Sequence, residues 1–325
     1  MKICFVFRNK KAGYSIAKVF NTFIPYIKNS SSIELPNYRA DILSVLRNLI
    51  FIIRSKPSCD IFHLTGNIEY CALFLPPRKV ILTIHDLVLI NHNSYSKIKR
   101  LLFYYLWYYF PLKRAKVVTC ISDKTRQDLL FFFPWAKDKT FVIPNPVSED
   151  IRYVEKEFDK NSPVILHIGT RENKNLERVI ESLKGLNVRM RIIGSLNNSQ
   201  ISKLKENKIE YSSVSDLTDS EIAREYEKCD IVSFPSTYEG FGLPIIEGFS
   251  AGRIVVTSLL EPMRSISNGH AILVDPYDVE SIREGFLKAI YEQDVRHSFI
   301  NEGLIEAKYY SAYCISEKYM EIYKK

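Results

Sequence analysis

The chain has 325 residues, of which 46% are hydrophobic and 25% are charged. This length is more than one typical hydrophobic core needs, so two domains are expected, and the hydrophobic content is ordinary for a globular protein. The net charge of +8 is compatible with a nucleic acid, an anionic membrane surface or an anionic substrate as partner. The most basic aromatic region, residues 97–116, contains no recognised nucleic-acid-binding motif.

Cysteine usage and apolar runs limit the class of protein further. None of the six cysteines forms a C-x-x-C pair, which argues for reduced thiols in a cytosol and against a zinc site or a disulfide framework. Residues 1–7 are too short for the apolar core of a signal peptide and are interpreted as a first buried strand. The sequence has no stretch of ~18 uncharged apolar residues, so no membrane span is expected.

The first half of the chain alternates short apolar runs with segments of helical spacing. A helix is predicted at residues 16–27, and strands are predicted at residues 2–7, 59–64, 80–84, 117–121 and 141–143. This alternation predicts a parallel sheet with helices on both faces. A polar, charged segment at residues 148–162 ends this half.

The same alternation then begins again. Helices are predicted at residues 176–183, 221–228 and 302–325, and strands at residues 164–168, 188–193, 231–234 and 254–257. The predicted class is therefore α/β, with two Rossmann-like halves. Ligands of such sheets bind beyond the carboxyl ends of the strands. Four candidate site residues lie just after predicted strands, on that side: His85, Gly169, Lys174 and Glu239.

Residues 231–252 are predicted to form a strand, a glycine-containing loop and a helix. Pro244 suits the first position of that helix and Gly252 suits its end. The free N–H groups of a helix N-terminus attract phosphate, whereas the carboxylates of Glu239 and Glu247 accept hydrogen bonds from hydroxyls. Phosphate donors beside two hydroxyl acceptors suit a sugar that is joined to a nucleotide.

This segment resembles the E-x7-E signature of retaining glycosyltransferases of family 4, which have the GT-B fold. Further segments resemble the family in the expected order, from about residue 2 to residue 290: residues 83–87, 120–125, 142–147, 167–176, 261–264 and 273–276. The sequence departs from the family pattern at Thr170, where most relatives carry an arginine, and at Asn145-Pro146, which replaces Asn-Gly.

The resemblance implies two Rossmann-like domains that face each other across a cleft. Residues 1–150 would form the N-terminal, acceptor-side domain, and residues 151–307 would bind the nucleotide-sugar donor. The final helix, about residues 308–325, would pack back on the first domain.

The resemblance also implies the donor-binding residues. Lys174, with Arg171, would contact the phosphates, Glu239 would contact the sugar hydroxyls, and Glu247 would hold the ribose hydroxyls. The full donor-binding set is Gly13, Gly169, Thr170, Arg171, Lys174, Phe241, Gly242, Leu243 and Glu247.

Each of these residues also has a purely structural interpretation. Lys174 could be a solvated lysine at a helix start, Glu239 could form a capping box with Ser236, and Glu247 could lie on an exposed helix face. Gly13 could serve a simple turn.

On the acceptor side, the resemblance places His85 against the transferred sugar and makes Asp86 an orienting or acceptor-activating group. The catalytic set is then His85, Lys174 and Glu239. The alternative for His85 is a hydrogen-bonded histidine at a strand end. His85 and His92 match no common zinc spacing, and the sequence has no D-x-D pair, so metal-independent catalysis is expected.

The predicted function is retaining transfer of a mannosyl or glucosyl group from a GDP-sugar or UDP-sugar. The acceptor would be a growing cell-surface glycan or a lipid-linked glycan. The protein would be cytoplasmic, with peripheral membrane contact through the aromatic stretch at residues 101–110, for which a mostly buried helix is the alternative. A sugar-nucleotide epimerase and a non-catalytic partner of another transferase are the competing functions.

Overall fold

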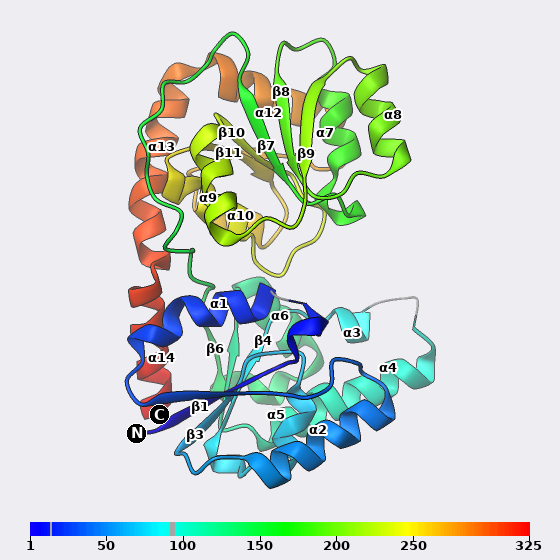
Figure 1. Ribbon diagram of the computed structural model, residues 1–325, viewed down its shortest axis with the longest axis vertical. Helices are drawn as coiled ribbons and strands as arrows, with labels where there is room; N and C mark the ends of the chain where they lie inside the picture. Colours follow the sequence, from blue (N-terminus) through cyan, green and yellow to red (C-terminus); the bar gives the residue numbers. More distant parts are fainter. Residues whose placement is uncertain (14, 92–94) are drawn as a thin grey trace. The chain divides into compact units, whose positions relative to one another are not determined.

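The computed structural model describes residues 1–13, 15–91 and 95–325 (Figure 1). The chain forms two compact units, of which the first comprises Met1–Pro146 with Ala312–Lys325 and the second comprises Val147–Ser311. Each unit contains one six-stranded sheet in which all neighbouring strands are parallel. The predicted α/β class with two parallel sheets is therefore confirmed.

The sheet of the first unit has the strand order β2-β1-β3-β4-β5-β6. Its strands are β1 (Ile3–Phe7), β2 (Ser30–Glu34), β3 (Ile61–Leu64), β4 (Val80–Ile84), β5 (Val117–Cys120) and β6 (Thr140–Val142). Strand β2 was not predicted from the sequence, because this edge strand is rich in serine and only partly buried. The central strands are buried along their whole length, as continuous apolar runs predict.

The first unit places helices on both faces of its sheet. They are α1 (Ser15–Phe23), α2 (Ile42–Ser55), α3 (Val88–Asn91), α4 (Lys97–Phe103), α5 (Phe110–Arg114), α6 (Asp123–Phe132) and α14 (Ala312–Lys324). A 3-10 segment, η3 (Glu69–Phe74), precedes β4, and a π-helix, η5 (Tyr104–Tyr109), joins α4 to α5. The C-terminal helix α14 packs on α1, where the rings of Phe23 and Tyr319 stack with centroids 4.8 Å apart.

The sheet of the second unit has the strand order β12-β11-β10-β7-β8-β9. Its strands are β7 (Val164–Ile168), β8 (Arg189–Ile193), β9 (Glu210–Val214), β10 (Ile231–Phe234), β11 (Ile254–Ser258) and β12 (Ile272–Val274). The two edge strands, β9 and β12, were not predicted. Strand β9 is largely exposed and β12 has only three residues, so neither shows a continuous buried run.

The helices of the second unit are α7 (Leu176–Ser182), α8 (Asn198–Glu206), α9 (Asp219–Lys228), α10 (Leu243–Ala251), α11 (Met263–Ser267), α12 (Val279–Tyr291) and α13 (Gln293–Ala307). Helix α10 begins one residue before Pro244 and ends at Gly252, whose φ is +70°. It lies close to the sheet, because a Cβ on Gly248 would be only 2.7 Å from Cγ2 of Val255.

The six cysteines form no disulfide bond, and five of them are buried. Within the described ranges, no helix combines the length with the apolar composition that crossing a bilayer requires.

Candidate active site

The loop after β7 is shaped by two residues with positive φ. Gly169, with φ +91°, directly follows the strand, and Asn175, with φ +63°, ends the short 3-10 turn η7 (Glu172–Lys174). A Cβ on Gly169 would lie 2.8 Å from Cγ of Lys174. Glycine therefore allows the aliphatic chain of Lys174 to cross directly over the strand end.

Lys174 forms an ion pair with Glu239 beyond the end of β7. Its Nζ lies 2.6 Å from Oε1 of Glu239, and it also lies 4.8 Å from the centroid of the Phe234 ring. Asn173 donates a second hydrogen bond to the same carboxylate oxygen. The side chains of Lys174 and Glu239 are only 21% and 16% exposed, so this is a partly buried ion pair.

The sheet topology explains why these two residues meet. Strands β7 and β10 are neighbours, and the chain continues from them toward opposite edges of the sheet. Lys174 follows β7 and Glu239 follows β10, so both lie at the topological switch point, where α/β sheets place their ligands. No helix begins at Ser236, so Glu239 does not form the alternative capping box, and Lys174 is held in a partly buried ion pair rather than free in solvent.

The N-terminus of α10 follows Glu239 in the chain. Gly242 precedes the helix with φ +133°, and Leu243 is its first residue. Phe241 is buried and its ring lies 6.1 Å from that of Tyr310. The first amides of α10 thus come directly after the loop that carries Glu239, and such amides favour an anion.

Glu247 lies inside α10 and is 7% exposed, so the expected alternative of a surface glutamate is wrong. The hydroxyl of Tyr226, from α9, donates to Oε2 of Glu247 over 2.6 Å. Burial, together with this carboxylate, holds the pKa of Tyr226 well above its usual value, so the tyrosine stays a donor. Glu247 is therefore held in a fixed rotamer by a buried partner.

Thr170 and Arg171 precede Lys174 in the same loop. The hydroxyl of Thr170 donates to the carbonyl of Ser195, after β8, and Arg171 is exposed. Both residues line a cavity of about 530 Å³ between α7 and α8. This cavity is at the carboxyl edge of the sheet, beside the Lys174 loop.

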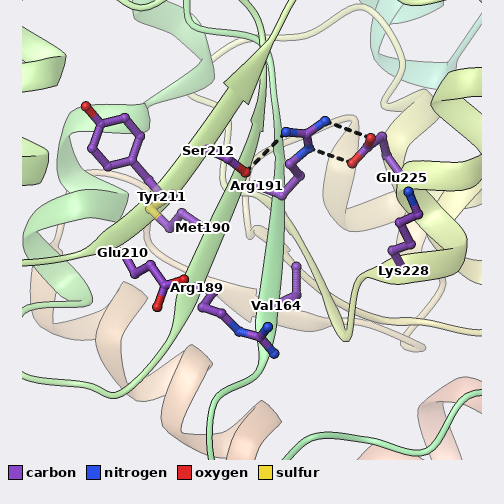
Figure 2. Close-up of a pocket in the computed structure, with 9 residues that line it drawn as sticks. All are labelled: Val164, Arg189, Met190, Arg191, Glu210, Tyr211, Ser212, Glu225 and Lys228. Atoms are coloured by element: carbon purple, nitrogen blue, oxygen red, sulfur yellow. Dashed lines mark hydrogen bonds and ion pairs between the residues drawn. The ribbon is translucent and has the colours of Figure 1, made fainter.

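A second hollow, a groove of about 450 Å³, lies at the opposite edge of the same sheet, where the strands begin (Figure 2). It is lined by the first residues of three strands, Val164, Arg189 and Glu210. Arg191 forms two hydrogen bonds with the carboxylate of Glu225 across this groove, at 2.7 and 2.8 Å. This pair fixes α9 to the sheet and is separate from the residues around Lys174.

In the first unit, His85 follows β4 and is mostly buried. Its Nε2 lies 2.8 Å from the carbonyl oxygen of Thr65, which can only accept, so Nε2 carries the proton. Burial lowers the pKa of His85, so the neutral ring presents Nδ1 as an acceptor. Gly66 makes room for this ring, because a Cβ there would be 2.4 Å from Cδ2 of His85.

Asp86 and Gly13 are held by local contacts. Oδ1 of Asp86 accepts from the amide of Val88. Gly13 is exposed with φ +124°, and its carbonyl accepts from Nη2 of Arg8 over 3.0 Å. Arg8 directly follows β1, so the loop that carries Gly13 is tied to the carboxyl edge of the first sheet.

Glu69 is a buried carboxyl group at this edge that the sequence analysis did not identify. It is 3% exposed, and Oε1 accepts from the amide of Asn67. Oε2 has no hydrogen-bond partner among the described residues. Burial, reinforced by the charge of Asp86, raises the pKa of Glu69 to about 7. The only sequence signal was an acidic residue shortly after a predicted strand.

The predicted site residues thus fall into two groups. One group lies in the second unit and comprises Gly169, Lys174, Glu239 and the start of α10. Glu247 lies within the same helix α10 and is bonded to Tyr226. Gly13, His85 and Asp86 belong to the first unit. No cluster of three or more His, Cys, Asp or Glu side chains that could hold a metal ion occurs in the part of the chain that is described, and His92 lies outside that part.

Two family models match successive parts of the chain. The model for glycosyltransferase family 4 matches residues 19–151, and the model for glycosyl transferases group 1 matches residues 149–304. A curated relative, the O-antigen chain mannosyltransferase B of Escherichia coli, is 24% identical over an aligned length of 323 residues. The match covers 89% of this chain and 84% of that protein.

Solved structures share the fold over nearly the whole chain. HepE from Anabaena, in complex with UDP and glucose, has a TM-score of 0.77 at 15% identity and covers 99% of this chain and 98% of its own. WaaG, a glycosyltransferase involved in lipopolysaccharide biosynthesis, has a TM-score of 0.70 at 14% identity, with coverages of 98% and 99%.

Proposed function

The two family models and the paired parallel sheets indicate a glycosyltransferase with the GT-B fold, and from this premise we propose that the chain is a retaining hexosyltransferase. The donor is a GDP-sugar or UDP-sugar, and the transferred group is of the mannosyl or glucosyl type. The acceptor is a growing cell-surface glycan or its lipid-linked form. The name of the E. coli relative supports the mannosyl choice.

The observation that carries this proposal is the pairing of Lys174 with Glu239 at the switch point of the second sheet. Lysine and the amides at the start of α10 stabilise the charge that develops on a departing phosphate. The carboxylate of Glu239 accepts hydrogen bonds from sugar hydroxyls, and Glu247 does so from the ribose. The lysine and the helix amides therefore match the diphosphate of a nucleotide sugar, and the two carboxylates match its sugar and its ribose.

In the reaction that we propose, the acceptor hydroxyl oxygen bonds to the anomeric carbon on the face from which the phosphate leaves. The bond between that carbon and the phosphate oxygen breaks, and the hydroxyl proton passes to the departing phosphate. The products are a glycoside with retained configuration and a nucleoside diphosphate. Nδ1 of His85 accepts a hydrogen bond from a sugar hydroxyl, and Asp86 acts on the acceptor side.

We also propose that this chemistry takes place without a metal ion and at the cytoplasmic face of a membrane. The absence of a D-x-D pair from the sequence supports the first part. The six cysteines form no disulfide bond and five of them are buried, which supports a reducing compartment.

The test is product analysis with GDP-mannose and UDP-glucose, with and without a mannose-terminated oligosaccharide. Transfer predicts release of nucleoside diphosphate that depends on the acceptor, together with an α-configured product in the proton NMR spectrum. An isomerised nucleotide sugar would support an epimerase instead. A β-configured product would contradict the retaining mechanism, and binding without turnover would support a non-catalytic partner.

A further inference from the structure

Helix α2 exposes a row of large aliphatic side chains. Ile42 is 77% exposed and Leu43 is 66% exposed, and three more residues along the same side, Leu46, Ile50 and Ile53, are about half exposed. The opposite side of α2 is anchored in the core by Asn48, Leu49 and Ile52. The row is therefore the outer face of a firmly packed helix, and water covers it only at a free-energy cost.

The segment from α4 through η5 to α5 shows the same arrangement. Phe103, Trp107 and Leu112 point into the core of the first unit. The outer face exposes six apolar or aromatic side chains: Ile98, Leu101, Leu102, Tyr105, Leu106 and Phe110. The predicted alternative of a mostly buried helix is therefore correct for one face only.

These two outer faces lie on the same side of the first sheet. The short segment η3 contacts both α2 and the η5–α5 segment, so it lies between them. Figure 1 shows α2 and the α4–α5 segment along one side of this unit. Together their exposed apolar side chains form a surface that we call the apolar face.

The positive charge of the chain coincides with the apolar face. Residues 42–116 contain 11 lysines and arginines and three acidic residues, a net charge of +8, whereas the rest of the chain has 34 residues of each sign. One of the three acidic residues, Glu69, is buried. Exposed cations border the apolar rows on both segments, among them Arg47, Arg54, Lys97 and Arg100.

This combination of features selects among the surfaces that could cover the apolar face. A second copy of the chain would bring +8 against +8, which electrostatic repulsion opposes. A nucleic acid would satisfy the charge but would leave the leucines and isoleucines in water. An anionic bilayer satisfies both, because acyl chains receive the apolar side chains while headgroups pair with the bordering cations.

We propose that the apolar face formed by α2 and the α4–α5 segment docks on an anionic lipid bilayer. The aliphatic and aromatic side chains enter the boundary between headgroups and acyl chains, and the arginines and lysines bind the headgroup phosphates. This inference does not depend on the glycosyltransferase activity, although it would bring a lipid-linked acceptor to the first unit.

The full chain is tested by flotation with vesicles of equimolar phosphatidylglycerol and phosphatidylcholine, and with vesicles of phosphatidylcholine alone. The protein is expected to float with the anionic vesicles only. Binding should weaken strongly near 1 M salt, where the Debye length falls to ~3 Å. Equal binding to both vesicles, or no binding to either, would overturn the proposal.

Two sets of variants assign the binding to this face. The triple change Arg47→Gln, Lys97→Gln and Arg100→Gln should weaken partitioning on the order of 100-fold, whereas Lys184→Gln, Lys205→Gln and Lys228→Gln remove the same charge from the second unit with little effect.

The apolar contribution is tested by Leu43→Ser, Leu46→Ser and Ile50→Ser, which should weaken partitioning at least about tenfold. The matched control changes three exposed side chains of the second unit, Tyr291→Ser, Ile305→Ser and Tyr309→Ser. Thermal midpoints confirm that all variants fold. Equal losses in test and control variants would refute the assignment. So would self-association in vesicle-free solution that the Leu43, Leu46 and Ile50 changes abolish, because a second copy would then cover the face.

Discussion

Glu239 accepts hydrogen bonds from both Lys174 and Asn173. A diphosphate that approaches Lys174 must compete with this carboxylate for the ammonium group. In the proposed function, the phosphate takes over the lysine while Glu239 keeps its bond from Asn173 and turns an oxygen toward a hydroxyl of the sugar. On this proposal the ion pair holds both groups in place before the donor binds, which would reduce the entropy lost on binding.

Glu239→Gln should separate the roles of these two residues. The amide oxygen can still accept from Lys174, so the dissociation constant for a nucleoside diphosphate should change less than about threefold. Binding of the complete nucleotide sugar should weaken about tenfold or more, because a charge-assisted bond to the sugar is lost. Calorimetric titrations with the two ligands check this, and equal weakening of both would place Glu239 at the phosphates.

Glu69→Gln should make the first unit more stable at alkaline pH. The folded pKa of about 7 lies above the ordinary value of 4.5, so the stability that the protonated carboxyl group provides is fully present below pH 4.5 and is lost as pH rises to about 7. The variant should therefore exceed the wild type in free energy of unfolding by up to about 3 kcal/mol at pH 8.

The measurement is urea unfolding followed by tryptophan fluorescence at pH 5 and pH 8. Both tryptophans of the chain, Trp107 and Trp135, lie in the first unit, so they report on the relevant part. Buried histidines impose their own pH dependence on both proteins alike, and the difference between the proteins isolates Glu69. A difference that is the same at the two pH values would show that Glu69 titrates normally.

Some site residues could be predicted from local sequence and others could not. Lys174 and Glu239 each follow a strand in a segment with glycines, and these are local signals. The requirement for Gly66 arises from its φ of +129° and from the ring of His85, which occupies the space where its Cβ would be. Glu69 has no neighbouring motif, and its raised pKa comes from burial, reinforced by the charge of Asp86.

At the scale of elements, the loop after β7 depends on the geometry of Gly169. Gly169→Ala should displace Lys174 from Glu239, since the new Cβ would lie 2.8 Å from Cγ of the lysine. We expect a loss of stability of about 1–3 kcal/mol from the strained backbone and a weakening of diphosphate binding by about tenfold.

Gly185→Ala is the matched control for this change. Gly185 also has positive φ, at +76°, but a Cβ there would meet no atom within 4 Å. The control should lose similar stability and keep its affinity for the diphosphate. If both variants bind equally well, the position of Lys174 does not depend on Gly169.

The C-terminal helix α14 is an integral part of the first unit. Tyr319 is 3% exposed and stacks on Phe23, and its neighbour Tyr323 bonds to Nδ1 of His63 over 2.7 Å. Tyr319→Ala should lower the free energy of unfolding of this unit by about 3–5 kcal/mol. Tyr313→Ala, at a position 58% exposed on the same helix, should cost at most about 1 kcal/mol.

Tryptophan fluorescence during urea unfolding measures both variants of α14. A midpoint for Tyr319→Ala that matches the Tyr313→Ala control would mean that α14 does not stabilise the first unit.

Burial decided which elements the sequence analysis could predict. Buried central strands such as β4 and β11 are continuous apolar runs that are visible in the sequence. Strands β2 and β9 are edge strands with exposed polar residues, and they lack that signal. Helix α2 was not predicted, although its polar and apolar residues alternate with helical periodicity.

At the scale of the whole molecule, the sequence predicts that two sheets follow one another along the chain. It also shows that the positive charge is unevenly distributed. The restart of the strand–helix alternation after residues 148–162 predicted two sheets, and the structure has one in each unit. The charge of residues 42–116 was visible in the sequence as well, but its meaning required knowledge of which apolar residues remain exposed.

The central claim is that the carboxyl edge of the second sheet binds a nucleoside diphosphate through Lys174. The most direct measurement is calorimetric titration of GDP and UDP into the wild type and into Lys174→Met, with Lys184→Met as a control. The wild type and the control should bind one of the two nucleotides with equal affinity. Lys174→Met should bind it about 10- to 100-fold more weakly, because a charge-assisted phosphate contact is lost. Equal affinity in all three proteins would contradict the account.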